Sequence, residues 1–238
     1  MSEVGGHDVT VIGAGIVGIC CALELANSGL TVRVIDREGP AEGTSFGNAG
    51  VISPWSCVPQ SLPGQWKNIP RWILSPEGPV ALRWTYLPYL MPWLARFLAS
   101  AQVSRIDRIA DGILSLNRNC PDLYRELLRG TGHENLVRDS CYIHVFRDSR
   151  QADSGQVQWA LRRERGVPME FVSGDEAREI EPALSPVYQG AVLIRGQARA
   201  LNPGRLGQVL ADKARDLGVV FTRALVQELM PGNSGSCR

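Results

Sequence analysis

Six residues near the start of the chain have the types and spacing of a phosphate-binding loop. The segment Gly13-Ala14-Gly15-Ile16-Val17-Gly18 has the pattern GxGxxG, and an acidic residue, Asp36, follows at close to the expected spacing of about 20 residues. Glycines permit a tight turn and let the backbone approach a pyrophosphate with no Cβ in the way. Free N–H groups at a helix start favour bound phosphates. The pattern therefore predicts a dinucleotide site, in which Asp36 accepts hydrogen bonds from ribose hydroxyls.

The elements that must position this loop can be read from the flanking residues. Asp8–Ile12 is a short β-branched run, apolar residues recur at helical spacing from Ile16 to Ala26, and Val32–Ile35 is a second β-branched run. Gly29 stops the helix. The order is strand, turn, helix and strand, which is the Rossmann-like context that makes an otherwise weak glycine pattern specific.

The residues after Asp36 decide which dinucleotide is favoured. A carboxylate at this position would repel a 2′-phosphate, which argues against NADP. A domain for NAD usually continues with further strand–helix units, whereas this chain runs into Gly43-Thr44-Ser45-Phe46-Gly47-Asn48-Ala49-Gly50. Small residues and backbone amides suit a segment along the ribityl chain and ring of a flavin, so FAD is favoured. A surface loop without a ligand is the alternative.

Further elements follow along the chain. Apolar residues from Val103 to Leu127 trace one face of an amphipathic helix that Pro121 should kink or divide. A helix is predicted at 151–165, and a short helix follows a capping box of Ser173 and Glu176. Asn202 and Pro203 should open a helix that ends near Asp216. Strands are predicted at 141–146, 167–172, 190–194, 219–222 and 224–229.

The segment from Trp66 to Leu98 is rich in tryptophan and proline, and the prolines predict short helices. Its longest uncharged run, between Arg83 and Arg96, is too short to span a bilayer, which takes about 20 apolar residues. Two interpretations stay open. One is a packed helical cap over a binding cleft, and the other is a membrane-surface patch with Trp and Tyr at headgroup level.

Composition excludes several classes of partner and site. A net charge of +1 gives no electrostatic case for nucleic acid. The three histidines have no ligand-like spacing, which predicts no metal site. The polar N-terminal segment lacks the features of a secretory signal and the six cysteines show no pairing rhythm, which together predict a cytoplasmic protein. The sequence leaves open a peripheral contact of this cytoplasmic protein with the inner face of the membrane.

Several segments together resemble a known family. VIGAGIVG with VRVIDRE, TSFGNAGVISP, EIEPAL and LNPGRLGQVLADKARDLGV are similar to the D-amino-acid dehydrogenase small-subunit family, within the FAD-dependent oxidoreductases that include D-amino-acid, glycine and sarcosine oxidases. The resemblance extends from about Val9 to about Leu229. It implies an α/β fold with a discontinuous FAD-binding domain, at 1–57 and 202–238, and an α+β substrate domain at 58–201.

The resemblance also implies an activity and a set of site residues. The reaction would be oxidation of the C–N bond of a D-amino acid, or of a related amine such as a cyclic imino acid, by hydride transfer to flavin, as part of amino-acid catabolism. Electrons would then pass to a quinone or another acceptor. The implied FAD contacts are Gly13, Ala14, Gly15, Ile16, Val17, Gly18, Asp36, Arg37, Thr44, Ser45, Asn48, Ala49, Gly50 and Val226, with Val226 on the last strand.

The end of the sequence departs from the family pattern. Residues 231–238 resemble no family segment, and the segments that close the flavin site and grip the substrate carboxylate are expected beyond them. Arg195 and Arg199 are the candidate carboxylate clamps within the chain, against the alternative of solvated surface arginines. Two rival functions are therefore kept, a C-terminally truncated and inactive fragment and an oxygen-using amine oxidase of the glycine or sarcosine type.

Overall fold

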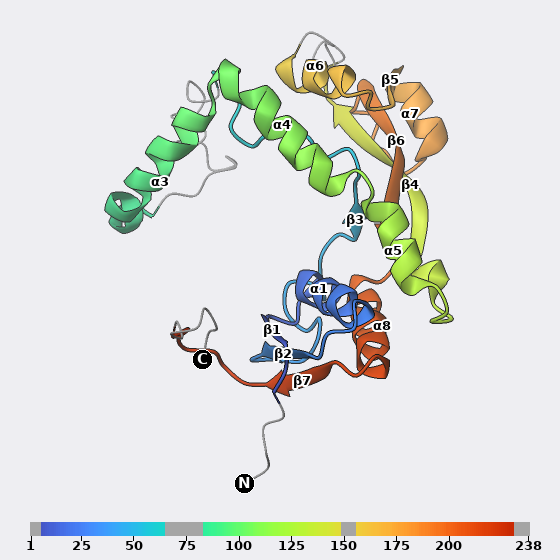
Figure 1. Ribbon diagram of the computed structural model, residues 1–238. Helices are drawn as coiled ribbons and strands as arrows, with labels where there is room; N and C mark the ends of the chain where they lie inside the picture. The colour runs from blue at the N-terminus through green and yellow to red at the C-terminus, as the bar shows by residue number, and fades with distance from the viewer. Residues whose placement is uncertain (1–5, 65–82, 149–155, 231–238) are drawn as a thin grey trace. The chain divides into compact units, whose positions relative to one another are not determined.

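The computed structural model describes residues 6–64, 83–148 and 156–230 and separates the chain into two compact units. Unit 1 consists of Met1–Ile52, Pro121–Asp139 and Ala198–Arg238, and unit 2 consists of Ser53–Cys120 and Ser140–Gln197. Strands β4 (Val137–Phe146) and β6 (Gly190–Ala200) each cross a boundary between the units. Figure 1 shows the elements in chain order. The mixed α/β fold predicted from the sequence is confirmed.

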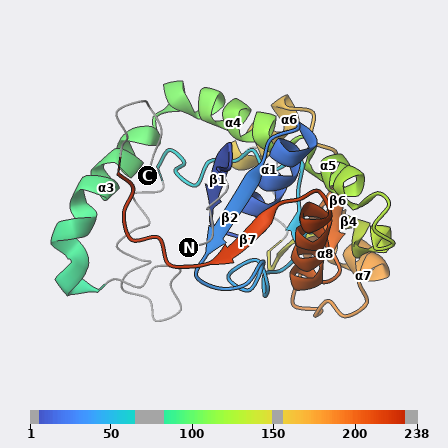
Figure 2. The same ribbon diagram turned by 60° about the horizontal axis from the view of Figure 1, so that its bottom comes forward.

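Unit 1 is built on a parallel three-stranded sheet. Strand β1 (Val9–Ile12) pairs with β2 (Val32–Asp36), and β2 pairs with β7 (Val220–Arg223), which gives the order β1-β2-β7 that Figure 2 shows. Helix α1 (Ile16–Asn27) joins the first two strands, as parallel pairing requires. Its buried residues Ile19, Ala22 and Leu23 repeat at helical spacing and form its core-facing stripe.

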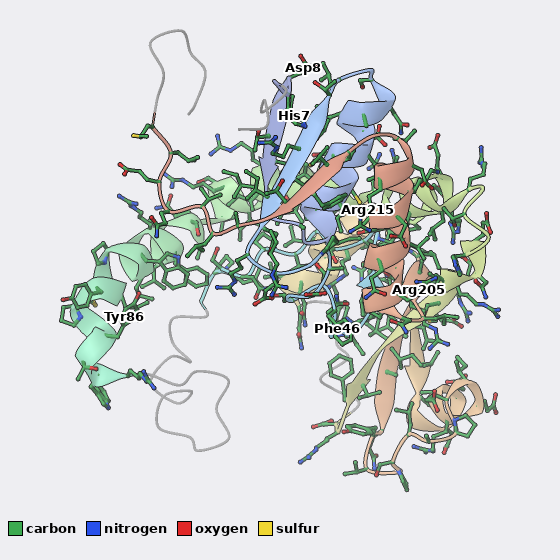
Figure 3. All side chains as sticks on the ribbon, turned by 90° about the horizontal axis from the view of Figure 1, so that it is seen from below. His7, Asp8, Phe46, Tyr86, Arg205 and Arg215 are labelled. Atoms are coloured by element: carbon green, nitrogen blue, oxygen red, sulfur yellow. The ribbon has the colours of Figure 1, made fainter. Side chains whose placement is uncertain are left out.

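Helix α8 (Pro203–Asp216) lies beside α1 and leads into β7 (Figure 1). It begins as the sequence predicts, because the Asn202 side chain accepts a hydrogen bond from the Arg205 N–H at 2.9 Å and Pro203 occupies the first turn. At its other end the Arg215 guanidinium lies over the Phe221 ring, 4.8 Å from the centroid, and Figure 3 labels Arg215 there. Unit 1 also contains β3 (Val51–Ile52), η3 (Glu134–Leu136) and most of α5 (Cys120–Leu128).

Unit 2 contains the larger part of a second sheet, in the order β3-β6-β4, with β5 (Met169–Ser173) also antiparallel to β6. Helix α4 (Val103–Asn117), helix α6 (Val157–Glu164) and helix α7 (Gly174–Ile180) accompany it. The predicted capping box of Ser173 and Glu176 opens α7 and is confirmed. The buried core of this unit gathers residues far apart in sequence, namely Cys57, Leu114, Trp159, Val167, Val192 and Ile194.

Prolines have different effects on two predicted helical segments, the Trp-rich segment and the amphipathic helix from Val103 to Leu127. Residues 65–82, with Trp66 and Trp72, lie outside the described part, but η2 (Trp84–Tyr86) and the 14-residue helix α3 (Leu87–Ser100) cover the rest of the Trp-rich segment. The prediction of short helices is wrong for α3. Pro88 sits in the first turn, where no N–H is needed, and Pro92 removes a single bond from an otherwise continuous helix. Between α4 and α5, Pro121 does divide the predicted helix.

The predicted strand at 224–229 is wrong, because residues 224–230 have no regular structure. One backbone hydrogen bond, from the Ala224 N–H to the Asp36 carbonyl at 2.8 Å, extends the β7 pairing beyond Arg223. A strand needs a partner along its length, and within the described residues none pairs with 225–230. Among the described helices, none has the length and apolar character needed to cross a membrane.

Candidate functional site

The glycine segment forms the turn between β1 and α1, and two hydrogen bonds hold its backbone N–H groups. The Gly13 N–H donates to the Ile35 carbonyl at 2.8 Å, and the Ala14 N–H donates to Asp36 Oδ2 at 2.7 Å. Gly13 has φ +102°, a conformation that favours glycine, and a Cβ on Gly18 would overlap the Gly13 carbonyl oxygen. The turn is therefore tight, and α1 starts directly against it.

The N-terminus of α1 has unused donors. The N-cap residue Gly15 has no side chain, and the Ser45 hydroxyl from the following loop accepts the Ile16 N–H at 2.9 Å in its place. Within the described part of the chain, no acceptor is bonded to the N–H groups of Gly15, Val17 or Gly18. Unpaired N–H groups and the helix dipole favour an anion at this position.

Asp36 is fixed by two backbone donors at the end of β2. Its Oδ2 accepts from Ala14, as above, and its Oδ1 accepts from the Glu38 N–H at 2.7 Å. Partial burial raises the pKa of Asp36, but these hydrogen bonds and the nearby Arg37 charge outweigh it, so the pKa lies below its ordinary value. A carboxylate has about four acceptor positions, so the ionised Asp36 can still accept two hydrogen bonds from a ligand.

A hollow of about 190 Å³ lies beside Asp36. It is lined by Ile12, Gly13, Ile35, Asp36, Arg37, Ala224, Leu225 and Val226. Val226 and Asp36 therefore line the same hollow. Val226 lies on an irregular segment and not on the predicted strand. The hollow lies in unit 1, where the β2 carboxyl end and the chain after β7 meet.

The loop predicted to line a flavin is a folded turn and not a loose surface loop. The Asn48 Oδ1 accepts from the Gly50 N–H at 2.8 Å, and its Nδ2 donates to the Ser45 carbonyl at 3.2 Å. Gly50 has φ +68°, and a Cβ there would overlap the Ala200 carbonyl oxygen. The loop is thereby fixed to the end of β6, and Figure 3 shows Phe46 near Arg205 in the first turn of α8.

A second hollow, of about 360 Å³, lies along this loop. It is lined by Ile16, Ser45, Asn48, Ala49, Gly50, Val51, Ile52, Tyr124, Ala200, Pro203 and Leu206. The first five of these residues were predicted from the sequence, and the other six were not. Thr44 lines neither hollow. Nothing local marks Tyr124 or Ala200, because they reach the hollow only through the packing of α5 and β6 in unit 1.

The two arginines proposed as carboxylate clamps differ in their surroundings. Arg195 forms an ion pair with Glu170 across neighbouring strands, at 3.0 Å, and both side chains are more than half exposed. Arg199 is exposed on β6 opposite Val51, and within the described residues no carboxylate lies at ion-pair distance from it. Arg195 is therefore already satisfied by a surface partner. In the described part of the chain, no group of three His, Cys, Asp or Glu side chains is placed to hold a metal ion.

A parallel βαβ unit with this glycine turn, an acidic residue at the end of β2 and unpaired donors at the helix start defines a dinucleotide-binding protein. Residues 8–236 match the family model of FAD dependent oxidoreductases. The chain belongs to this family, and FAD is accordingly its cofactor.

Individual relatives agree with the family assignment. A D-amino-acid oxidase of Bradyrhizobium diazoefficiens is 35% identical over 222 residues, which cover 92% of this chain and 52% of the relative. The chain thus spans about half the length of that relative. Glycine oxidase from Geobacillus kaustophilus has a similar fold, with a TM-score of 0.61, 21% identity and coverage of 96% of this chain and 50% of that one. L-α-glycerophosphate oxidase from Mycoplasma pneumoniae, solved with FAD bound, gives a TM-score of 0.59 at 16% identity, over 97% and 48% of the two chains.

Proposed function

We propose that unit 1 binds FAD across the N-terminus of α1, with the adenosine on one side and the flavin on the other. The adenosine would occupy the hollow at Asp36, Arg37 and Val226, and the flavin would lie along the loop that lines the larger hollow. The observation that carries this proposal is the set of unpaired N–H groups at the start of α1. The proposed contacts are Gly13, Ala14, Gly15, Ile16, Val17, Gly18, Asp36, Arg37, Thr44, Ser45, Asn48, Ala49, Gly50 and Val226.

Each part of the site has a physical task under this proposal. The N–H groups of Gly15, Val17 and Gly18 stabilise the pyrophosphate, and the ionised Asp36 accepts hydrogen bonds from the ribose hydroxyls. The Asn48 turn holds the loop in one conformation, which fixes its backbone amides before the ligand arrives. When bound, FAD would supply the redox chemistry by accepting two electrons from the substrate carbon.

The reaction we propose is oxidation of the C–N bond of an amino acid or a related amine, and more narrowly of a D-amino acid. The Cα–H would pass as a hydride to bound FAD, the neutral amine would become an iminium, and hydrolysis of the iminium would give a keto acid and an ammonium ion. The similarity to a protein named D-amino-acid oxidase supports the substrate class. Unit 2 would carry the substrate site. The domains proposed from the sequence, 1–57 with 202–238 for FAD and 58–201 for the substrate, differ from the two units chiefly at 121–139, which belongs to unit 1.

The electron acceptor is a separate part of the proposal. The similarity to a protein named as an oxidase favours oxygen as the acceptor, and a quinone is the alternative. Turnover of D-alanine with oxygen alone, compared with turnover with an artificial dye, separates the two. Strong dye reduction without hydrogen peroxide would identify a dehydrogenase.

Contact with a membrane surface is the remaining element of the proposal, and it concerns α3. Trp84 is 70% exposed, Tyr89 is 76% exposed and Trp93 is 57% exposed, and from Arg83 to Ile106 the sequence contains no acidic residue. Figure 3 labels Tyr86 beside them. Aromatic and basic residues of this kind suit a headgroup region with anionic lipids. Sedimentation with anionic vesicles that is unaffected by Trp84→Ala and Trp93→Ala together would contradict this part.

The visible absorption spectrum of the purified protein tests the cofactor proposal. We expect flavin bands, and we expect Gly15→Leu to abolish them, because a side chain at Gly15 points toward the Ser45 hydroxyl, 3.3 Å from the position of its Cβ. Gly43→Ala is the control, since a Cβ at Gly43 meets no described atom within contact distance. Tight NADH binding without flavin uptake, or equal flavin content in Gly15→Leu, would refute the proposal.

A further inference from the structure

An arginine in unit 2 that plays no part in the proposed flavin site lies in unusual surroundings. Arg162, on α6, is partly buried, and its guanidinium covers the ring of the fully buried Trp159 at 5.0 Å from the centroid. Its Nη1 donates to the backbone carbonyl of Gln158 at 3.3 Å. Its Nε is buried and has no acceptor, and the same is true of the Trp159 indole N–H.

The described rings that pack around Trp159 and Arg162 are uncharged at pH 7. His144 packs edge-on against Trp159 at 5.4 Å, and burial, with the Arg162 charge, lowers its pKa to about 4, so the ring is neutral at pH 7. The Tyr142 ring is tilted against His144 at 4.5 Å between centroids, and Trp159 is also contacted by Phe146, on the same strand β4, and by Phe171 on β5. The surroundings of this cation are therefore aromatic and of low polarity.

Some other arginines of unit 2, namely Arg165, Arg178 and Arg195, have carboxylate partners. Arg165, three residues further on and with a side chain only 8% exposed, pairs with Asp107 at 3.1 Å and with Asp111 at 2.9 Å. Arg195 pairs with Glu170. For Arg162, by contrast, no Asp or Glu lies at ion-pair distance among the described residues.

A partly desolvated cation without a counter-ion is costly, and the unpaired indole N–H of Trp159 beside it adds further positive potential. A bound anion would relieve both effects. The single positive charge of Arg162 matches the single negative charge of a carboxylate, and the aromatic rings favour an apolar body attached to it.

We propose that Arg162, with Trp159 and His144, forms a binding site for a small organic carboxylate. The carboxylate contacts the guanidinium at Nη2, because Nη1 donates to the Gln158 carbonyl and Nε is buried. Two sources have this chemistry, an amino acid and a carboxylic acid without an amine. The proposal does not depend on flavin binding, so a protein without flavin bands would leave it standing.

Titration of the purified chain with sodium propionate and with D-alanine tests the site, with sodium chloride at equal ionic strength as the reference. The readouts are tryptophan fluorescence and the thermal unfolding midpoint. We expect a saturable response to propionate that chloride does not produce. Arg162→Gln should weaken it by about tenfold or more, through loss of a charge-assisted bond. Arg162→Lys, which keeps the charge and much of the packing, should weaken it less.

Arg163→Gln is the matched control, since Arg163 is the exposed neighbour on the same helix. It should leave the titration within about twofold of the wild type. A response to both ligands identifies the carboxylate as the determinant, and a response to D-alanine alone identifies an amino acid as the ligand. A wild-type response equal to that of chloride, or an Arg162→Gln curve that overlays the wild type, would overturn the proposal.

Discussion

The glycine turn of unit 1 and the aromatic cluster of unit 2 achieve their chemistry by opposite means. Around Gly13–Gly18 the active groups are backbone N–H donors, and the side chains matter chiefly by being absent. Around Trp159 the active groups are large side chains that come from α6, β4 and β5. The backbone donors of the turn come from consecutive residues, whereas the side chains of the aromatic cluster meet only through packing between segments distant in sequence. The two regions should therefore respond differently to mutation.

The largest effect is expected in unit 2, from Trp159→Ala. Trp159 is fully buried and contacts Arg162, His144, Phe146 and Phe171, so its removal leaves a large cavity. The free energy of unfolding should fall by about 3–5 kcal/mol, as measured by urea denaturation. Val157→Ala, at a half-exposed position on the same helix, should change it by less than about 1 kcal/mol. A Trp159→Ala effect no larger than this control would show that the cluster is not a core.

In unit 1 the corresponding variant is Gly18→Ala, which adds a methyl group where Trp159→Ala removes a ring. Gly18→Ala places a Cβ against the Gly13 carbonyl oxygen, so either the turn or the start of α1 must move. We expect a loss of about 2–3 kcal/mol in the free energy of unfolding, the usual cost of overpacking. Gly43→Ala, where the added Cβ meets open space, is the control. If both variants unfold at the same urea concentration, the turn tolerates side chains and the close approach is not required.

The cluster of unit 2 should also make stability depend on pH, whereas the backbone donors of the turn do not titrate. The pKa of His144 falls from 6.5 in the unfolded chain to about 4 in the folded one, because of burial and the Arg162 charge. The unfolded state thus binds the proton first as pH falls, so this contribution to stability is lost as pH falls from about 6.5 toward 4.

After allowance for partial solvent exposure, the loss should be about 1–2 kcal/mol between about pH 7.5 and pH 5. His144→Gln should flatten this part of the pH profile, measured by urea denaturation at each pH. Asp36, whose pKa lies below its ordinary value, loses its stabilising effect only at lower pH, so the two groups act in separate windows. A profile that is unchanged in His144→Gln would assign the loss to other groups.

The smallest effect should come from Ser45→Ala. The Ser45 hydroxyl caps α1 from a neighbouring loop, and removal of a cap costs about 1 kcal/mol. Ser28→Ala is the control at the other end of the same helix, where the hydroxyl only donates to the Glu24 carbonyl, and it should cost a few tenths of a kcal/mol, roughly. Equal midpoints of thermal unfolding for the two variants would mean that the contact between the loop and α1 adds no stability.

Some features of this protein were determined by the sequence alone. The βαβ unit, the position of Asp36, the start of α8 at Asn202 and the capping box at Ser173 were all predicted, because each depends on residues within a few positions or within one short motif. The sequence also marked Ser45, Asn48 and Gly50, whose turn is held by hydrogen bonds within the loop, and their contact with FAD stays a prediction.

Other features were decided only by the tertiary structure. The cap that Ser45 provides for α1, the approach of Tyr124 and Ala200 to the larger hollow, and the irregular path of Val226 all depend on which segments become neighbours. The same holds for Arg162. In the sequence Arg162 stands between Leu161 and Arg163 with no motif around it, and the candidate clamps named from the sequence are Arg195 and Arg199. Packing places Arg195 beside Glu170 and places Arg162 over the indole ring of Trp159. The desolvation and pairing of each arginine therefore depend on its folded surroundings.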